Sequence, residues 1–134
     1  IDFANVRFVP HVYKFMLAQD RAGQELHRRR LLEAFQHMET EGLGKSAGPY
    51  WLGRDVSLVD LSFFPHLDRF SAIEHYRDFK LPESCPRLRA WREVMRERPS
   101  VIATSASPDV YVRGWRKYAE NTSAGTTARD MRES

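Results

Sequence analysis

The stretch from Asp55 to Pro65, DVSLVDLSFFP, constrains the fold more than any other part of the sequence. A serine lies three residues before an aspartate, with apolar residues around both, which is the capping-box pattern that begins an α-helix. We expect the Ser57 hydroxyl to accept a hydrogen bond from the Asp60 N–H, and the Asp60 carboxylate to accept one from the Ser57 N–H. Val56 and Leu61 have the spacing of a hydrophobic staple around this cap. The stretch therefore predicts a helix with Ser57 as its N-cap.

A proline lies inside this predicted helix. Pro65 has no N–H to donate to the carbonyl of Leu61, and its ring crowds that carbonyl, so we expect a kink. Pro10 raises the same problem in a first predicted helix over residues 2–19. Apolar side chains continue on most sides of the central helix as far as Ile73, which is typical of a buried helix. We therefore expect a bent bundle in which the first and central helices are kinked.

The other segments also have helical rather than strand periodicity. Apolar residues recur at helical spacing over 24–41 and after Pro86, and Ser107-Pro108 has the pattern of a helix start. A glycine-rich loop over 42–53 separates two of the predicted helices, and a short turn is expected over 99–103. These patterns predict an all-α fold of about five to six helices in one domain over 1–121. Small and charged residues dominate from Thr122, so we expect residues 122–134 to be a disordered tail.

Composition excludes several classes of protein. The 134 residues are 42% hydrophobic and 29% charged, as in an ordinary globular protein, and no apolar run approaches the length of a membrane span. The net charge of +3 is small, and the basic run over 28–30 is typical of a solvated helix face, so we expect no nucleic-acid partner and no membrane partner. One cysteine excludes an internal disulfide and favours a cytoplasmic location.

The stretch GPYWLGRDVSLVDLSFFPHLDRF resembles the start of the central helix of the glutathione transferase C-terminal domain, and CPRLRAWREVMRERPSV is similar to the next helix of that family. The resemblance extends from about Phe3 to Asn121 and is strongest to the omega class and related thiol reductases. It implies a dimeric enzyme whose thioredoxin-like domain carries the glutathione site and a Cys-Pro motif. It also implies that this thioredoxin-like domain is absent from the present chain.

The resemblance places candidate acceptor-binding residues on the central and last helices. It puts Arg69 beside the acceptor pocket, where it could hold an anionic group, although an ion pair with Asp68 or another carboxylate is an equal alternative. Tyr111, Trp115 and Tyr118 form an aromatic stripe on the last predicted helix. That helix overhangs the pocket in the family, but the same spacing also suits core packing.

Three further positions on the chain have alternative interpretations. His11 and Phe15, one turn apart in the first helix, could line the same pocket, or they could be ordinary surface and core residues. Cys85-Pro86 has the letters of the omega-class active-site motif, yet it begins a later helix where the family has a structural proline, so we interpret Cys85 as structural. The five histidines have no spacing that predicts a metal site.

From these patterns and the resemblance we expect the C-terminal acceptor-binding and dimerisation domain of a glutathione-dependent transferase or thiol reductase. Glutathione would be the co-substrate, bound mainly by the thioredoxin-like domain, and the acceptor a small electrophilic or oxidised compound. The chain by itself would then be an inactive fragment, with the catalytic residue elsewhere, and the intact protein a homodimer. The alternative is a non-catalytic interaction module in a translation or scaffold protein.

Overall fold

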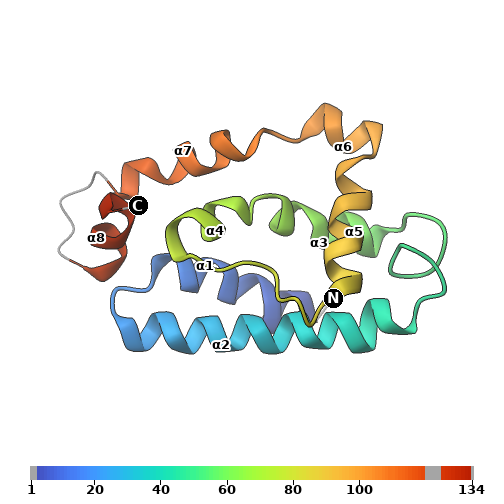
Figure 1. The fold of residues 1–134 in the computed structure, drawn as a ribbon, viewed down its shortest axis with the longest axis horizontal. Helices are drawn as coiled ribbons and strands as arrows, with labels where there is room; N and C mark the ends of the chain where they lie inside the picture. Colours follow the sequence, from blue (N-terminus) through green and yellow to red (C-terminus); the bar gives the residue numbers. More distant parts are fainter. Residues whose placement is uncertain (1–2, 120–124, 134) are drawn as a thin grey trace. The chain divides into compact units, whose positions relative to one another are not determined.

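The computed structural model describes residues 3–119 and 125–133, and over these residues the regular structure is helical. The α-helices are α1 (Val9–Leu17), α2 (Arg21–His37), α3 (Leu58–Asp68), α4 (Ser71–Arg77), α5 (Pro86–Arg96), α6 (Pro99–Thr104), α7 (Pro108–Ala119) and α8 (Thr126–Glu133) (Figure 1). Within the described ranges, β-type pairing is limited to an isolated bridge between Tyr50 and Gly53. The predicted all-α fold is confirmed.

The chain forms two compact units. The first unit consists of residues 1–31, 69–80 and 106–134, and the second unit consists of residues 32–68 and 81–105. In the first unit α4 packs against α1, α7 and α8, and α8 packs along α7. In the second unit α5 packs against α3 and α6.

Prolines begin several of these helices. Pro86 and Pro99 occupy the first position of α5 and α6, where the missing N–H would have no partner inside the helix. Pro10 lies in the first turn of α1, and a π-helical turn, Ala4–Phe8, precedes it. The first predicted helix is therefore irregular just before Pro10, where the backbone changes from π-helical at Phe8 to α-helical at Val9. The turn expected over 99–103 is the short helix α6.

The predicted central helix is interrupted one turn beyond its proline. Pro65 lies inside α3, which continues to Asp68. Arg69 and Phe70 form a turn, and α4 begins at Ser71 with the Ala72 N–H donating to the Arg69 carbonyl at 3.2 Å. The predicted irregularity of this segment thus takes the form of two consecutive helices.

The glycine-rich loop of the second unit is anchored by a tryptophan. Trp51 stacks on Phe63 with ring centroids 4.7 Å apart, and its edge meets Trp91. The ring lies directly against the backbone at Gly42, where any side chain would overlap it. Glycine at this position therefore permits the loop to be fixed against the core of the second unit.

The prediction of a disordered tail over 122–134 is wrong for its described part. Residues Thr126–Glu133 form α8, in which Thr127 and Met131 are 3% exposed. The Thr126 N–H donates to the carbonyl of Gln19 at 2.9 Å. The polar composition of this segment gave no sign of the helix, because α8 is held by a few buried side chains and by two long-range ion pairs of Asp130, with Arg21 and with Arg77.

Candidate functional site

The six predicted acceptor-binding residues all belong to the first unit. They come from α1, from the turn before α4, and from α7. The residues are His11, Phe15, Arg69, Tyr111, Trp115 and Tyr118. Since α4 packs against both α1 and α7, one short helix links the two main contributors.

Phe15 is completely buried and belongs to an aromatic cluster. Its ring lies 5.4 Å from that of Phe79, and the guanidinium of Arg28 lies 5.3 Å from the Phe15 ring and 5.2 Å from the Phe79 ring. An arginine held between two aromatic faces gains cation–π attraction from both rings. These contacts favour the core alternative for Phe15.

His11 on α1 pairs with a histidine of α2. The Nδ1 atoms of His11 and His27 are 3.0 Å apart, and both side chains are half-buried. Burial, and after it the ammonium of Lys14, lowers the pKa of His27 from its ordinary value of 6.5. Two Nδ1 atoms at this distance can share one proton between them, so the contact requires at least one neutral ring.

Of the predicted aromatic residues of α7, the structure describes the side chains of Tyr111 and Trp115. The Tyr111 hydroxyl accepts a hydrogen bond from the Ala106 N–H at 3.0 Å, and both Tyr111 and Trp115 are partly exposed. Tyr118 belongs to α7, but its side chain lies outside the described residues. Arg69 is exposed in the turn before α4. Tyr111, Trp115 and Arg69 are therefore accessible to a ligand.

Two consecutive residues at the end of α4, which the sequence did not single out, connect the helices of the first unit. The hydroxyl of Tyr76 donates to the carbonyl of Val112 in α7 at 3.0 Å. The guanidinium of Arg77 donates to the carbonyls of Phe15 at 3.2 Å and Met16 at 2.6 Å, which belong to the last turn of α1. Carbonyls in the last turn of a helix lack partners within it, so Arg77 caps α1.

The buried guanidinium of Arg77 has its counter-ion on α8. Arg77 Nη1 lies 3.3 Å from Asp130 Oδ2, and the two side chains are 2% and 10% exposed. Burial lowers the pKa of Arg77, and the Asp130 carboxylate opposes this effect. Asp130 also accepts from Arg21 at 3.0 Å and from Gln24 at 3.1 Å, which ties α8 to the start of α2.

The capping aspartate of α3 is a junction within the second unit. Asp60 is fully buried, and its Oδ2 accepts from the Ser57 N–H at 2.8 Å, as predicted. The Ser57 hydroxyl donates to the same oxygen at 3.0 Å, whereas we had expected it to accept from the Asp60 N–H. Oδ1 accepts from the Trp51 N–H at 3.1 Å and from Trp91 Nε1 at 2.8 Å. The carboxylate thus joins the glycine-rich loop, α3 and α5.

The hydrophobic staple around this cap stays a prediction. Val56 is half-buried, and Leu61 is 50% exposed. A contact between them would therefore cover only part of Leu61.

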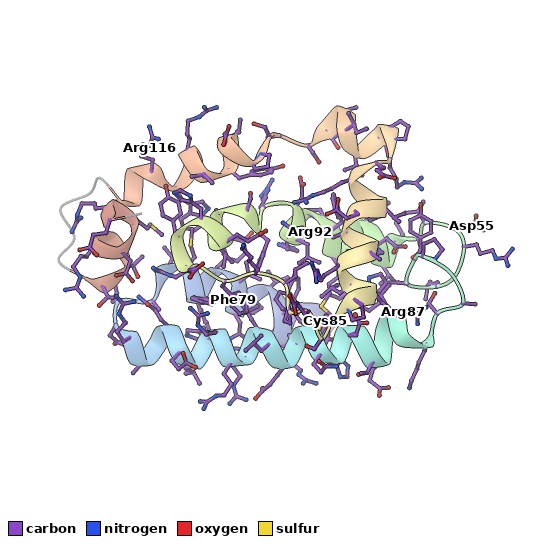
Figure 2. The ribbon with its side chains drawn as sticks, in the orientation of Figure 1. Asp55, Phe79, Cys85, Arg87, Arg92 and Arg116 are labelled. Atoms are coloured by element: carbon purple, nitrogen blue, oxygen red, sulfur yellow. The ribbon has the colours of Figure 1, made fainter. Side chains whose placement is uncertain are left out.

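Cys85 lies at the N-cap of α5, close to Arg87, but it is no candidate nucleophile (Figure 2). The carboxylate of Glu39 accepts from the N–H groups of Arg87 at 2.9 Å and Leu88 at 2.8 Å, and so occupies the helix N-terminus. Burial raises the pKa of the Cys85 thiol; a hydrogen bond with Ser84 opposes this, and the Glu39 charge raises it further. A catalytic thiolate needs the opposite environment. The structural interpretation of Cys85 is consistent with this geometry.

Within the part of the chain that the structure describes, His, Cys, Asp and Glu side chains form no group of three or more that could hold a metal ion. None of the described helices has the length and apolar character needed to cross a bilayer.

Comparison with known proteins finds a family match over the middle of the chain. Residues 21–93 match the family model described as "Glutathione S-transferase, C-terminal domain". The rice protein "Probable glutathione S-transferase DHAR1, cytosolic" (Oryza sativa subsp. japonica) is 35% identical over 72 residues, which are 53% of this chain and 34% of that protein. "Glutathione S-transferase DHAR2" of Arabidopsis thaliana is 33% identical over 86 residues, 63% of this chain and 38% of that protein.

A solved structure shares the fold along most of the chain. The structure titled "Crystal structure of glutathione transferase Omega 3C from Trametes versicolor" superposes with a TM-score of 0.66 and 23% identity. The match covers 90% of this chain and 52% of that one. The chain therefore spans about a third to a half of the length of the proteins that it matches.

Proposed function

Because the chain belongs to the family of glutathione S-transferase C-terminal domains, we propose that it is the acceptor-binding helical domain of a glutathione-dependent transferase or thiol reductase. The observation that carries this proposal is the family match, which includes the capped central helix and the first part of α5. In this proposal glutathione is the co-substrate, and a thioredoxin-like domain elsewhere in the natural protein binds it. The relatives, which are two to three times longer than their matched part, leave room for such a domain.

The proposed division of labour agrees with the chemistry of the chain's own residues. The thiol of Cys85 is buried and its pKa is raised, so it is poorly suited to activate glutathione or to form a mixed disulfide. A low-pKa cysteine on the thioredoxin-like domain would do that work. The helical domain would then bind, orient and desolvate the acceptor.

The proposed acceptor contacts come from α7 and from the turn before α4. Tyr111 and Trp115 offer partly exposed aromatic faces, which suit an apolar electrophile. Arg69 is exposed and cationic, and could hold a carboxylate or another anionic group of an oxidised acceptor. His11 would extend the same wall, whereas Phe15 would support it from the core; Tyr118 stays a prediction, because its side chain lies outside the described residues.

We further propose an omega-like, cytoplasmic homodimer. The structural neighbour is titled an Omega glutathione transferase, which supports the omega-like part of this proposal, and the name of the rice relative includes the word cytosolic, whereas the names of two other relatives include the word chloroplastic. Sedimentation of the natural full-length protein tests the dimer. A monomer at micromolar concentration would contradict it.

The function is tested with the natural full-length protein that contains this chain. Glutathione-dependent turnover of bis(2-hydroxyethyl) disulfide reports thiol transfer, and turnover of 1-chloro-2,4-dinitrobenzene reports conjugation. We expect at least one activity, and the absence of both would overturn the proposal. Trp115→Ala should raise the KM for the acceptor by about fivefold or more and leave the KM for glutathione unchanged, because it removes acceptor binding alone. Arg29→Ala, an exposed position on α2, is the matched surface control.

A further inference from the structure

The end of α4 makes polar contacts with every other α-helix that contributes to the first unit. The Tyr76 hydroxyl donates to Val112 in α7, and the Arg77 side chain donates to the last turn of α1 and pairs with Asp130 in α8. The Arg77 carbonyl accepts from Arg28 Nη2 in α2 at 3.1 Å. Two adjacent residues thus hold four helices by their polar groups.

These contacts are buried and directional. Tyr76 is 7% exposed and Arg77 is 5% exposed. A planar guanidinium that donates to two successive carbonyls fixes the end of α1 in both distance and orientation. A single tyrosine hydroxyl fixes α7 at Val112, which lies between Tyr111 and Trp115 in the sequence. A movement of α4 would therefore shift α1 and the aromatic wall of α7 together.

The turn after α4 is consistent with a fixed end. Asp78 has a φ of 48° and a ψ of 48°, a left-handed conformation that is uncommon for a residue other than glycine. The turn brings Phe79 to 5.8 Å from Phe70, where it is 5% exposed. The packing of Phe79 stabilises the unfavourable backbone at Asp78 and keeps the end of α4 in place.

We infer that Tyr76 and Arg77 are positioning residues, which set the position of α7 relative to α1. That position in turn sets the size of the acceptor that the domain can bind and the affinity with which it binds. This inference rests on the proposed function, since it assigns Tyr111 and Trp115 to the acceptor wall. Asp130 contributes to the same positioning, because it is the counter-ion of Arg77 and lies on α8, which packs along α7. None of the three residues need touch the acceptor.

The inference is tested with Tyr76→Phe, which removes one hydroxyl and keeps the ring, in the natural full-length protein. Tyr50→Phe is the matched control, because the Tyr50 hydroxyl makes a 2.8 Å hydrogen bond with Arg98 in the second unit. If Tyr76→Phe folds poorly, Asp130→Asn tests the same positioning of α7, because it keeps the shape of the side chain and removes its charge. The acceptor is the disulfide or the chlorodinitrobenzene above, whichever the native protein turns over.

We expect Tyr76→Phe and Asp130→Asn to raise the KM for the acceptor by about threefold or more, with the KM for glutathione and kcat within about twofold of native. Amide hydrogen exchange should rise over residues 108–116 in both variants. Tyr50→Phe should change neither the KM for the acceptor nor the hydrogen exchange over residues 108–116. An unchanged acceptor KM, or an equal rise in both KM values, would overturn the inference and leave the proposed function intact.

Failure of the proposed function gives a different result. If the native protein turns over neither acceptor, the proposed function falls, and the assignment of an acceptor wall falls with it. Hydrogen exchange still tests the structural step in that case. Unchanged exchange over 108–116 in Tyr76→Phe would show that the hydroxyl does not hold α7.

Discussion

Replacement of Asp60 by asparagine should be among the most destabilising conservative changes in the second unit. The carboxylate accepts four hydrogen bonds, from the Ser57 N–H and hydroxyl, the Trp51 N–H and the Trp91 indole. Asparagine can keep one oxygen toward the two tryptophans and can donate to the Ser57 hydroxyl. It cannot accept from the Ser57 N–H in that orientation. The variant therefore loses one bond and replaces charged acceptance by neutral acceptance in two others.

The magnitude follows from these bonds. An unsatisfied donor at the cap costs about 1–3 kcal/mol, and two bonds to a neutral rather than an ionised acceptor each lose about 1 kcal/mol. Because neighbouring terms do not add, we expect a loss of about 3 kcal/mol in the free energy of unfolding. That is a large part of the 5–15 kcal/mol that is usual for a domain, but it leaves the protein folded. Ser57→Ala removes only the hydroxyl and should cost about 0.5–2 kcal/mol.

The assay is urea unfolding followed by tryptophan fluorescence. With a urea m value of about 2 kcal/mol/M, the midpoint of Asp60→Asn should fall by about 1.5 M. Asp55→Asn is the matched control, since Asp55 is an exposed aspartate just before the same cap (Figure 2). A midpoint for Asp60→Asn within about 0.3 M of that control would show that the Asp60 carboxylate does not stabilise the second unit, because an error of that size is expected from the fit alone.

Three other perturbations should have distinct outcomes. Burial and Lys14 lower the pKa of folded His27 below 6.5, so the unfolded chain takes up a proton first as the pH falls. The stability that this group provides above pH 6.5 should therefore be lost below it. A His27→Gln variant that kept the same loss of stability would contradict this. Cys85 should react with a disulfide reagent at pH 8 only after denaturation, so rapid labelling of the native protein would be inconsistent with its burial and raised pKa. Asp130→Asn should lower the free energy of unfolding by about 1–3 kcal/mol, because it weakens the bonds to Arg77. Glu133→Gln, at an exposed position of the same helix, should not lower it. Equal effects of the two substitutions would exclude a special role for Asp130.

Features that depend on neighbouring residues could be predicted from the sequence, and those that depend on distant residues could not. The bond between the Ser57 N–H and Asp60 spans three residues and follows from the capping-box pattern. The bond from Trp91 to the same carboxylate spans 31 residues, and no local pattern indicates it. The periodicity of apolar residues likewise predicted the long helices, because each pattern is contained within one helix.

The same distinction explains why the role of Arg77 could not be predicted from the sequence. Arg77 caps α1 from 61 and 62 residues away and pairs with Asp130 from 53 residues away, so its role was invisible in the sequence. A basic residue in the last turn of α4 is also common for purely electrostatic reasons, which removes any remaining signal. The tail was misjudged for a related reason, because α8 depends on that ion pair and on the buried side chain of Met131. Polar composition measures neither contribution.

The most direct test is the glutathione-dependent activity of Cys85→Ala in the natural full-length protein. In the proposed function this chain positions the acceptor and supplies no reactive thiol. This role predicts that kcat and both KM values stay within about twofold of native. A loss of about a hundredfold or more in kcat, with urea unfolding unchanged, would contradict it and place the reactive thiol in this chain.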